Sequence, residues 1–183
     1  MLCEAGEIRF YGGVCSQDGI QPDPNKISAL KQMSAPTSRQ ELQTFLGLAN
    51  YMGPFIPNLN TLTAPLRELL KESHQFDRSP AHQEAYNKVK DSISSEVTLT
   101  YFDPKKEIIL QVDASLKGLG AALLQGNKPV AFASKALTDV ETRYANIERE
   151  LLPAVYGCDK FHTYLFGHSF TVNTTTNPSK VFT

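Results

Sequence analysis

An aspartate at the end of an apolar run is the residue of this sequence best placed to do chemistry. The run IILQV, residues 108–112, is followed by Asp113, a short turn and a second apolar run that begins at Gly118. Two such runs are typical of neighbouring antiparallel strands. A carboxylate fixed on a strand can bind a metal ion, but an aspartate here can equally start the turn through hydrogen bonds to the amides that follow. The stretch itself leaves both interpretations open.

The composition limits what the rest of the chain can be. Its 183 residues suffice for one domain or two small ones, and 41% apolar with 20% charged residues is ordinary for a soluble globular protein. The formal net charge of −1 provides no overall basic field, so any binding of nucleic acid would need local patches. Cys3, Cys15 and Cys158 lack metal-ligand spacing, which favours reduced thiols in an intracellular protein over disulfides or zinc.

The first residues argue against secretion. The segment MLCEAGEIRF carries charges where a signal peptide has its apolar core, and no window approaches the length of a membrane span. We therefore expect a soluble protein that is not secreted and has no membrane partner. The strand expected at residues 8–14 has no earlier element to pair with, so the chain is expected to begin inside a larger fold.

A small hairpin and a helical unit are expected in the first half of the chain. Residues 7–20 predict the hairpin, with two strands joined near Gly12 and Gly13. Capping residues and prolines then mark helix starts at Asp23–Pro24, at the capping box Ser38–Glu41, at Thr63 with Pro65, and at Ser79–Pro80. Residues 23–95 therefore predict a compact helical unit.

From residue 97 the pattern changes to short apolar runs. Strands are expected at residues 97–101, in the two runs around Asp113, and at residues 129–133 and 170–173. One helix is expected over residues 148–164, with an apolar side made of Leu151, Leu152, Val155, Cys158, Phe161 and Leu165. Strands followed by a helix and a further strand predict an α+β fold with a mixed sheet, and a domain boundary near residue 96.

Several motifs in a fixed order resemble one family. The segments VDASLKGLGAALLQ, KPVAFASKALTDVETRYANIERELL and YLFGHSFTVNTTTNPSK are similar to the ribonuclease H domain of gypsy-type retrotransposon and retroviral polymerases. Upstream, FYGGVCSQDGIQPDPNKISAL resembles the primer-grip hairpin and linker of their reverse transcriptase, and TSRQELQTFLGLANY resembles the start of its thumb.

The resemblance implies three parts. They are a primer-grip-like hairpin over residues 1–22, a helical thumb-like domain over residues 23–95 and a C-terminally truncated ribonuclease H-like domain over residues 96–183. The polymerase fingers and most of the palm have no counterpart, so the chain is not expected to be a polymerase by itself. Its implied partners are an RNA–DNA hybrid and the remainder of a Pol polyprotein, and its implied location is the cytoplasm, a virus-like particle or the nucleus.

The resemblance also implies a chemistry and its residues. Family members cleave the RNA strand of a hybrid with two Mg²⁺ ions held by four carboxylates, a hard-oxygen ligand set that suits magnesium. Asp113 matches the first carboxylate and Glu150, in ERELL, the second, so both are expected as catalytic and metal-binding residues. Thr175 occupies the third carboxylate position, and the fourth is expected beyond Thr183.

Pro153 is a second departure from the family pattern. A proline inside a helix removes one amide hydrogen bond and costs about 3 kcal/mol or more. It lies within one turn of Glu150. We therefore expect the helix either to restart at Pro153 or to kink and displace that carboxylate.

Three functions follow from these residues. An RNA–DNA hybrid ribonuclease would use Asp113 and Glu150, but the substitution at Thr175 predicts that it is impaired. A nucleic-acid-binding protein would contact phosphates through basic residues of the helical unit, for which the candidates are Arg39, Lys31, Lys88 and Lys90. The same side chains could instead form a solvated face balanced by acidic neighbours. The third possibility is a residual or domesticated interaction protein, for which no residue names a partner.

Overall fold

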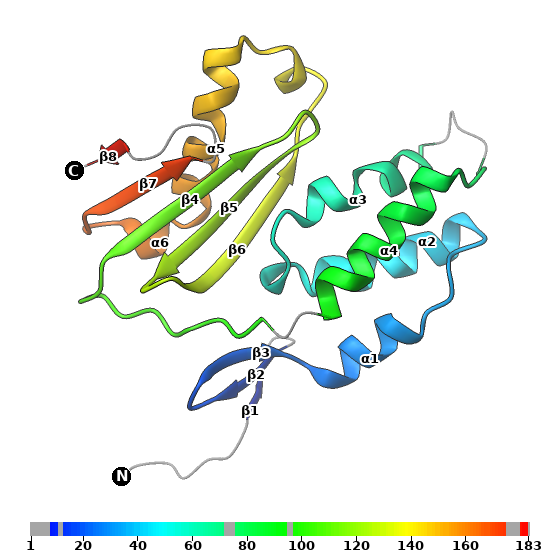
Figure 1. The fold of residues 1–183 in the computed structure, drawn as a ribbon, viewed down its shortest axis with the longest axis horizontal. Coiled ribbons are helices and arrows are strands. Elements are labelled where there is room, and N and C mark those ends of the chain that lie inside the picture. The colour runs from blue at the N-terminus through cyan, green and yellow to red at the C-terminus, as the bar shows by residue number, and fades with distance from the viewer. Residues whose placement is uncertain (1–7, 11–12, 72–75, 95–96, 175–179, 183) are drawn as a thin grey trace.

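The computed structural model describes residues 8–10, 13–71, 76–94, 97–174 and 180–182. Two sheets and a group of helices make up this part of the chain, which confirms the α+β class (Figure 1). The elements are β1 Ile8–Phe10, β2 Gly13–Ser16, β3 Gly19–Pro22, α1 Pro24–Gln32, α2 Arg39–Tyr51, η1 Gly53–Phe55, α3 Leu59–Glu68, α4 Pro80–Ser94, β4 Ile108–Ala114, β5 Gly118–Gln125, β6 Lys128–Ala136, η2 Glu141–Arg143, α5 Asn146–Lys160, α6 His162–Leu165, β7 Phe170–Thr174 and β8 Lys180–Phe182.

The first sheet has one strand more than the expected hairpin. β1, β2 and β3 form an antiparallel meander in that order. The joint expected at Gly12 and Gly13 falls partly outside the described residues. The additional strand begins at Gly19, whose φ of +137° favours glycine. A tight turn at this position therefore returns the chain for a second pairing.

Local capping signals explain the first two helices as predicted. Asp23 accepts a hydrogen bond from the amide of Asn25 at 2.9 Å, and Pro24 occupies the first helical position of α1. Ser38 accepts from the amide of Glu41 at 3.2 Å, and the Glu41 carboxylate accepts from the preceding amide of Thr37 at 2.7 Å. At each helix start, the residues that form the cap therefore lie within four positions of each other in the sequence.

The third helix begins earlier than predicted. α3 starts at Leu59 rather than at Thr63, and Pro65 lies inside it. The Thr63 hydroxyl donates to the Leu59 carbonyl at 2.8 Å, so it bonds within the helix instead of capping it. Contacts with the second sheet hold the added turn, because the Asn60 amide donates to Ser134 Oγ at 3.1 Å. Tertiary contacts thus override the local start signal.

The helical unit has its own apolar core. Each of α2 and α4 buries one apolar face. The buried residues are Leu42, Phe45, Leu46 and Ala49 on α2, and Ala85, Tyr86, Val89 and Ile93 on α4. This cluster contains no residue of the second sheet. The helices are thus held together independently of that sheet.

The second sheet has the order β6-β5-β4-β7-β8. β4 pairs antiparallel with β5 and parallel with β7, which gives the expected mixed sheet. Residues 97–101, expected as a strand, are not one in the described part of this segment. Leu99 bridges to Ile20 of the first sheet, whereas the amide of Thr100 donates to Pro129 of the second at 2.7 Å. Because its hydrogen bonds are divided between two sheets, the segment forms no continuous ladder.

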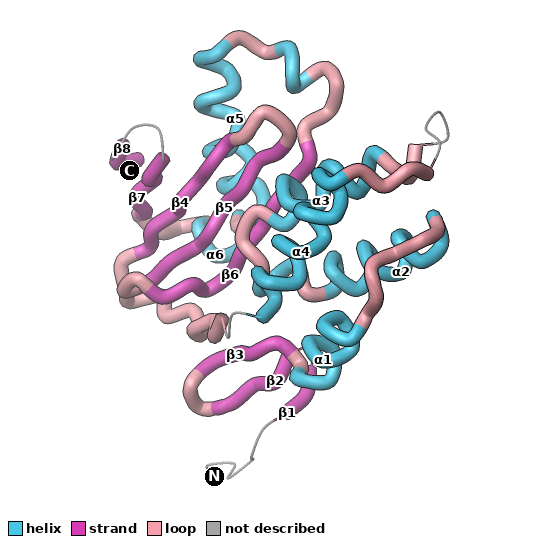
Figure 2. The backbone as a smooth tube through the Cα atoms, turned by 45° about the vertical axis from the view of Figure 1, so that its right-hand side comes forward, coloured by secondary structure: helices cyan, strands magenta, loops and turns pink. Residues whose placement is uncertain are grey.

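Helices cover the two faces of this sheet differently. α5 packs on the face that carries Leu110 and Val112, where a Cβ added at Gly157 would come within 3.1 Å of Leu110 Cδ1. The opposite face meets α3 beside β5 and β6 (Figures 1 and 2). The two faces of the central strand β4 are therefore directed toward different groups of helices.

The register of α5 differs from the predicted one. Leu151 and Val155, expected on the apolar side, are 49% and 64% exposed. The buried positions are spaced four residues apart at Pro153, Gly157, Phe161 and Leu165. The small Gly157 allows close approach to the sheet, which turns the larger apolar side chains outward. The expected single helix also ends at Lys160, and α6 follows after Phe161.

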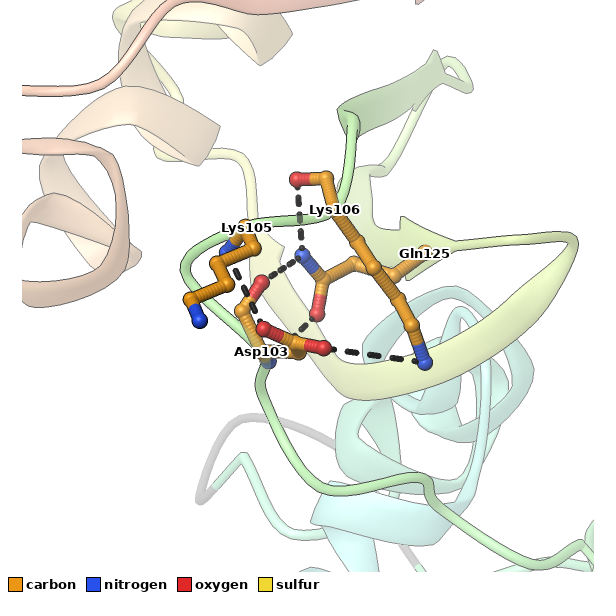
Figure 3. Close-up of polar contacts among 4 residues, drawn as sticks. All are labelled: Asp103, Lys105, Lys106 and Gln125. Carbon is orange, nitrogen blue, oxygen red and sulfur yellow. Dashed lines mark hydrogen bonds and ion pairs between the residues drawn. The ribbon is translucent and has the colours of Figure 1, made fainter.

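A buried glutamine fixes the loop before β4. Gln125 is only 3% exposed, and its Oε1 accepts from the Asp103 amide at 2.9 Å (Figure 3). Its Nε2 donates to the carbonyls of Asp103 at 2.8 Å and Lys106 at 3.2 Å. The side chain thereby supplies hydrogen bonds that a neighbouring strand would otherwise make. Among the helices of the described residues, none is long and apolar enough to cross a membrane.

Candidate functional site

Asp113 lies on a strand, and the neighbouring turn is organised by another residue. Asp113 is the penultimate residue of β4 and pairs with Gly120 of β5. The hydroxyl of Ser115 accepts hydrogen bonds from the amides of Lys117 at 3.3 Å and Gly118 at 3.0 Å. Ser115 therefore takes the role that the turn interpretation gave to Asp113. The carboxylate is left on a rigid element, where it can face a ligand or another part of the fold.

The half-buried carboxylate of Asp113 faces the helical unit. Side chains alternate along β4, so Asp113 points away from the face that Val112 shares with α5. On its own face, the Asn58 Nδ2 donates to Asp113 Oδ2 at 3.4 Å. This distance is at the long end for a hydrogen bond, but the charged acceptor strengthens it. A residue that directly precedes α3 thus contacts the strand that carries the candidate ligand.

A small cavity lies beside this contact. Its volume is about 130 Å³, and Asp113, Asn58 and Gln111 form its polar wall. The remaining lining residues are Pro57, Val112, Gly120, Ala121, Ala122, Leu124 and Phe132. The space is large enough for a few water molecules. Among the described residues that line it, Asp113 is the one carboxylate, so these residues offer little charge to a divalent cation.

Of the other two predicted metal-site positions, the structure describes only the backbone of Glu150. Glu150 is in the first turns of α5, and its side chain is not among those described. Thr175 lies outside the described residues. The strand before it, β7, runs parallel to β4 and pairs Thr174 with Val112. The chain therefore leaves β7 beside the strand that carries Asp113. α5 continues through Pro153, so the first of the two alternatives, a restart, is wrong, whereas a kink there stays a prediction.

The donor set does not fit a pair of magnesium ions. Within the described ranges, no three His, Cys, Asp or Glu residues group together as metal ligands. By sequence, Thr175 offers a neutral hydroxyl where the resemblance places a carboxylate. Two closely spaced Mg²⁺ ions need several anionic oxygens to offset their charge. With the hydroxyl of Thr175, the negative charge is lower by one than in the ligand set that the resemblance implies.

Three of the four basic candidates for nucleic-acid binding, all except Lys31, have contacts within the fold. Arg39 Nη1 donates to the carbonyls of Leu70 and Lys71, both at 3.1 Å, which caps the end of the α3 region. The Lys90 ammonium donates to the Met33 carbonyl at 3.0 Å and lies 5.2 Å from the Tyr86 ring centroid. These contacts give both residues a structural role.

The other two candidates are more accessible. Lys88 forms an exposed ion pair with Glu84 at 2.7 Å, one helical turn away. Lys31 is exposed on α1 beside a groove of about 500 Å³, which Gln21 and Pro22 of β3 line from the other side. Lys31 is therefore the candidate best placed to meet a phosphate. Nucleic-acid binding by all four residues stays a prediction.

Sequence reasoning missed Asn58 as a site residue. It has positive φ of 53° and directly precedes α3, yet its side chain makes no capping hydrogen bond. An asparagine before a helix normally indicates a capping residue, so the local pattern points to a helix cap and not to a contact with Asp113. Its contact with Asp113 joins residues 55 positions apart, which no local pattern could reveal.

Comparisons with known proteins agree with this architecture. Residues 79–172 match the model of the RNase H-like domain found in reverse transcriptase. The chain is 36% identical over 91% of its length to the retrovirus-related Pol polyprotein from transposon 297 of Drosophila melanogaster, and it covers 16% of that protein. It is 30% identical over 97% of its length to the transposon Tf2-3 polyprotein of Schizosaccharomyces pombe, and it covers 13% of that protein. The chain thus spans less than a fifth of the length of these relatives.

Solved structures show the same fold. The foamy viral protease-reverse transcriptase in complex with RNA/DNA hybrid matches with a TM-score of 0.78 at 23% identity, over 92% of this chain and 24% of the viral one. The same viral protein in complex with dsDNA matches with a TM-score of 0.77 at 22% identity, over 93% of this chain and 37% of the viral one. From the family match, this chain belongs to the family of RNase H-like domains found in reverse transcriptases.

Proposed function

We propose that this chain is part of a retroelement Pol polyprotein in which the RNase H fold is kept and the hydrolytic centre is impaired. The observation that carries the proposal is the donor set. Asp113 is on the expected strand, but Thr175 stands where the resemblance expects the third carboxylate. The family relationship supports the polyprotein context. An intracellular location, in the cytoplasm, a virus-like particle or the nucleus, belongs to the same proposal.

The division of the chain into three parts is also proposed. It comprises a primer-grip-like hairpin over residues 1–22, a thumb-like unit over 23–95 and an RNase H-like domain over 96–183. The separate apolar clusters of the helices and of the second sheet support the boundary near residue 96. Each cluster is large enough to define a structural unit of its own.

The impairment follows from charge. When bound, a pair of magnesium ions would supply an activated water and would stabilise the leaving oxygen. With Thr175 in the third position, the site would have one negative charge fewer than the four-carboxylate set that the resemblance implies. Thr175 adds a hydroxyl that stays neutral at any ordinary pH. We therefore infer that hybrid hydrolysis by this chain is lost or greatly slowed.

The test is release of labelled RNA from an RNA–DNA hybrid, in magnesium and separately in manganese. We expect the chain to release no more RNA than its Asp113→Asn variant, with an active ribonuclease H as positive control. Cleavage that disappears in Asp113→Asn would overturn the proposal. A Thr175→Asp variant supplies the carboxylate that the resemblance expects. Its cleavage should exceed that of the parent chain if charge at this position limits the reaction.

The alternative function is nucleic-acid binding without hydrolysis. The groove beside Lys31, about 500 Å³ in volume and lined by β3 and α1, favours this candidate. The solved neighbours were determined in complex with RNA/DNA hybrid or dsDNA, which gives it indirect support. Contacts with phosphates through Lys31 would make the affinity fall with added salt. Binding that is insensitive to salt would exclude this mode.

A further inference from the structure

The backbone at Asn58 departs from the usual way of starting a helix. Asn58 has φ 53° and ψ 28°, in the left-handed region, and its side chain leaves the first amides of α3 uncapped. A residue before a helix normally has extended backbone and accepts a hydrogen bond from one of those amides. Asparagine tolerates the left-handed region better than most residues. The side chain is therefore available for another contact.

That contact is with the second sheet. The Asn58 carboxamide lies over Gly120 of β5 and donates through Nδ2 to Asp113 Oδ2 of β4 at 3.4 Å. A Cβ at position 120 would collide with the carboxamide. At Gly118, two residues earlier on β5, a Cβ would come within 2.8 Å of Thr61 Oγ1. Two glycines on one face of β5 thus make room for the start of α3.

Further polar contacts surround this point. Asn60 Nδ2 donates to the carbonyl of Ser134 at 2.6 Å and to its hydroxyl at 3.1 Å. The hydroxyls of Thr61 and Ser115 lie 3.2 Å apart. Farther along α3, Glu68 forms an ion pair with Lys117 at 2.9 Å.

All of these contacts are polar. They are hydrogen bonds and an exposed ion pair between α3 and the sheet, and none of their residues belongs to the apolar core of either unit. Polar interfaces of this kind between the units of one chain are typically reversible. Two carboxylates act as acceptors among them, Asp113 on β4 and Glu68 on α3.

We propose that Asp113 serves in this chain as the acceptor of an interdomain latch, with Asn58 as its donor. The latch holds α3 on the sheet and places the Asn58 amide on the face of Asp113 that a cation or phosphate would have to reach. Asp113 thereby has a docking role that holds whether or not the chain hydrolyses RNA. Asn58 thereby covers part of the Asp113 carboxylate, at the wall of the cavity that both residues line.

The test is amide hydrogen exchange of the full chain in EDTA, read on peptides from α3 and from residues 115–118. Asn58→Gly removes the carboxamide while glycine keeps the left-handed backbone. Loss of one net hydrogen bond should speed exchange in both segments by about two- to tenfold. Exchange in α2 should stay unchanged. Gln43→Ala, at an exposed position of α2, is the control and should leave exchange in both segments unchanged.

Two variants of the acceptor distinguish a latch from a general loss of stability. Asp113→Asn keeps an oxygen acceptor and should exchange like the parent, whereas Asp113→Ala should speed exchange at least as much as Asn58→Gly. The double variant Asn58→Gly/Asp113→Ala should exchange no faster than Asp113→Ala alone, because the contact with Asn58 is already absent there.

Several outcomes would overturn the latch. Parent-like exchange in Asn58→Gly is one, and additive effects in the double variant are another. Should Asn58→Gly fail to fold, equal exchange in Asp113→Ala and Asp113→Asn would exclude it. Because EDTA removes divalent cations, the result is independent of the cleavage assay. The exchange experiment can therefore exclude the latch in a chain that is inactive, and it can support the latch in a chain that cleaves RNA.

Discussion

The side chain of Gln125 pairs with the backbone of Asp103 as a strand would. Its Oε1 accepts from the Asp103 amide and its Nε2 donates to the Asp103 carbonyl, at 2.9 and 2.8 Å. Residues 103–107 lead directly into β4, so this pairing fixes how the chain enters the strand that carries Asp113.

Replacement of Gln125 by leucine should therefore destabilise the fold. The variant leaves the amide and carbonyl of Asp103 without these partners, and such a loss costs about 1–3 kcal/mol. Urea unfolding followed by circular dichroism measures the change. Gln43→Leu, at an exposed position of α2, is the control and should change the free energy of unfolding by less than about 0.5 kcal/mol. Equal effects in the two variants would contradict a structural role for Gln125.

Acid should weaken the contact of Glu141 with Lys135. The Lys135 ammonium, 2.7 Å away, and the Thr138 amide lower the pKa of Glu141 from 4.5 to about 2. A lowered pKa means that the folded state favours the ionised carboxylate. Its contribution to stability is therefore complete above pH 4.5 and is lost as the pH falls toward 2.

Glu141→Gln tests this pH dependence. The variant should lose less stability than the parent between pH 4.5 and 2, as measured by urea unfolding at several pH values. Glu107→Gln removes another carboxylate, which is exposed, and serves as the control. A parent-like slope in Glu141→Gln would show that this carboxylate does not couple folding to protonation.

Removal of Pro153 should stabilise α5. The helix continues through this residue although proline has no amide to donate to Arg149. Pro153→Ala restores that hydrogen bond and should raise the free energy of unfolding by up to about 3 kcal/mol. Part of this gain is offset, because Pro153 is buried and the variant loses the packing of its ring. Pro80→Ala is the control, because Pro80 is the first residue of α4 and its amide would have no partner within the helix. A decrease in stability would show that packing of the proline ring outweighs the missing bond.

Lys31 and Arg39 should respond differently to substitution by alanine. Arg39→Ala removes donors to two carbonyls and should cost about 1 kcal/mol of stability. Lys31→Ala should leave stability unchanged, but if the chain binds hybrid duplex it should reduce the slope of log affinity against log salt by about 1. Fluorescence anisotropy with a labelled hybrid at several salt concentrations measures this slope. An unaltered slope would remove Lys31 from the nucleic-acid candidates.

The sequence by itself determined the elements whose signals are local. Asp23 with Pro24, and Ser38 with Glu41, start their helices through bonds within four residues, so their positions could be predicted. Two apolar runs separated by a turn likewise predicted β4 and β5. Asp113 was found on its strand because an apolar run and a turn bracket it.

Only the tertiary structure decided what surrounds Asp113. Asn58 reaches it across 55 positions, and Asn60 reaches Ser134 across 74. These contacts also start α3 one turn before Thr63, although the local signal favoured the later start. The physical reason is that a cap depends on neighbours along the chain, whereas a docking contact depends on which backbone surfaces are free of side chains. On β5 that condition is met at Gly120, where only the packed fold shows that the missing Cβ leaves room for an asparagine.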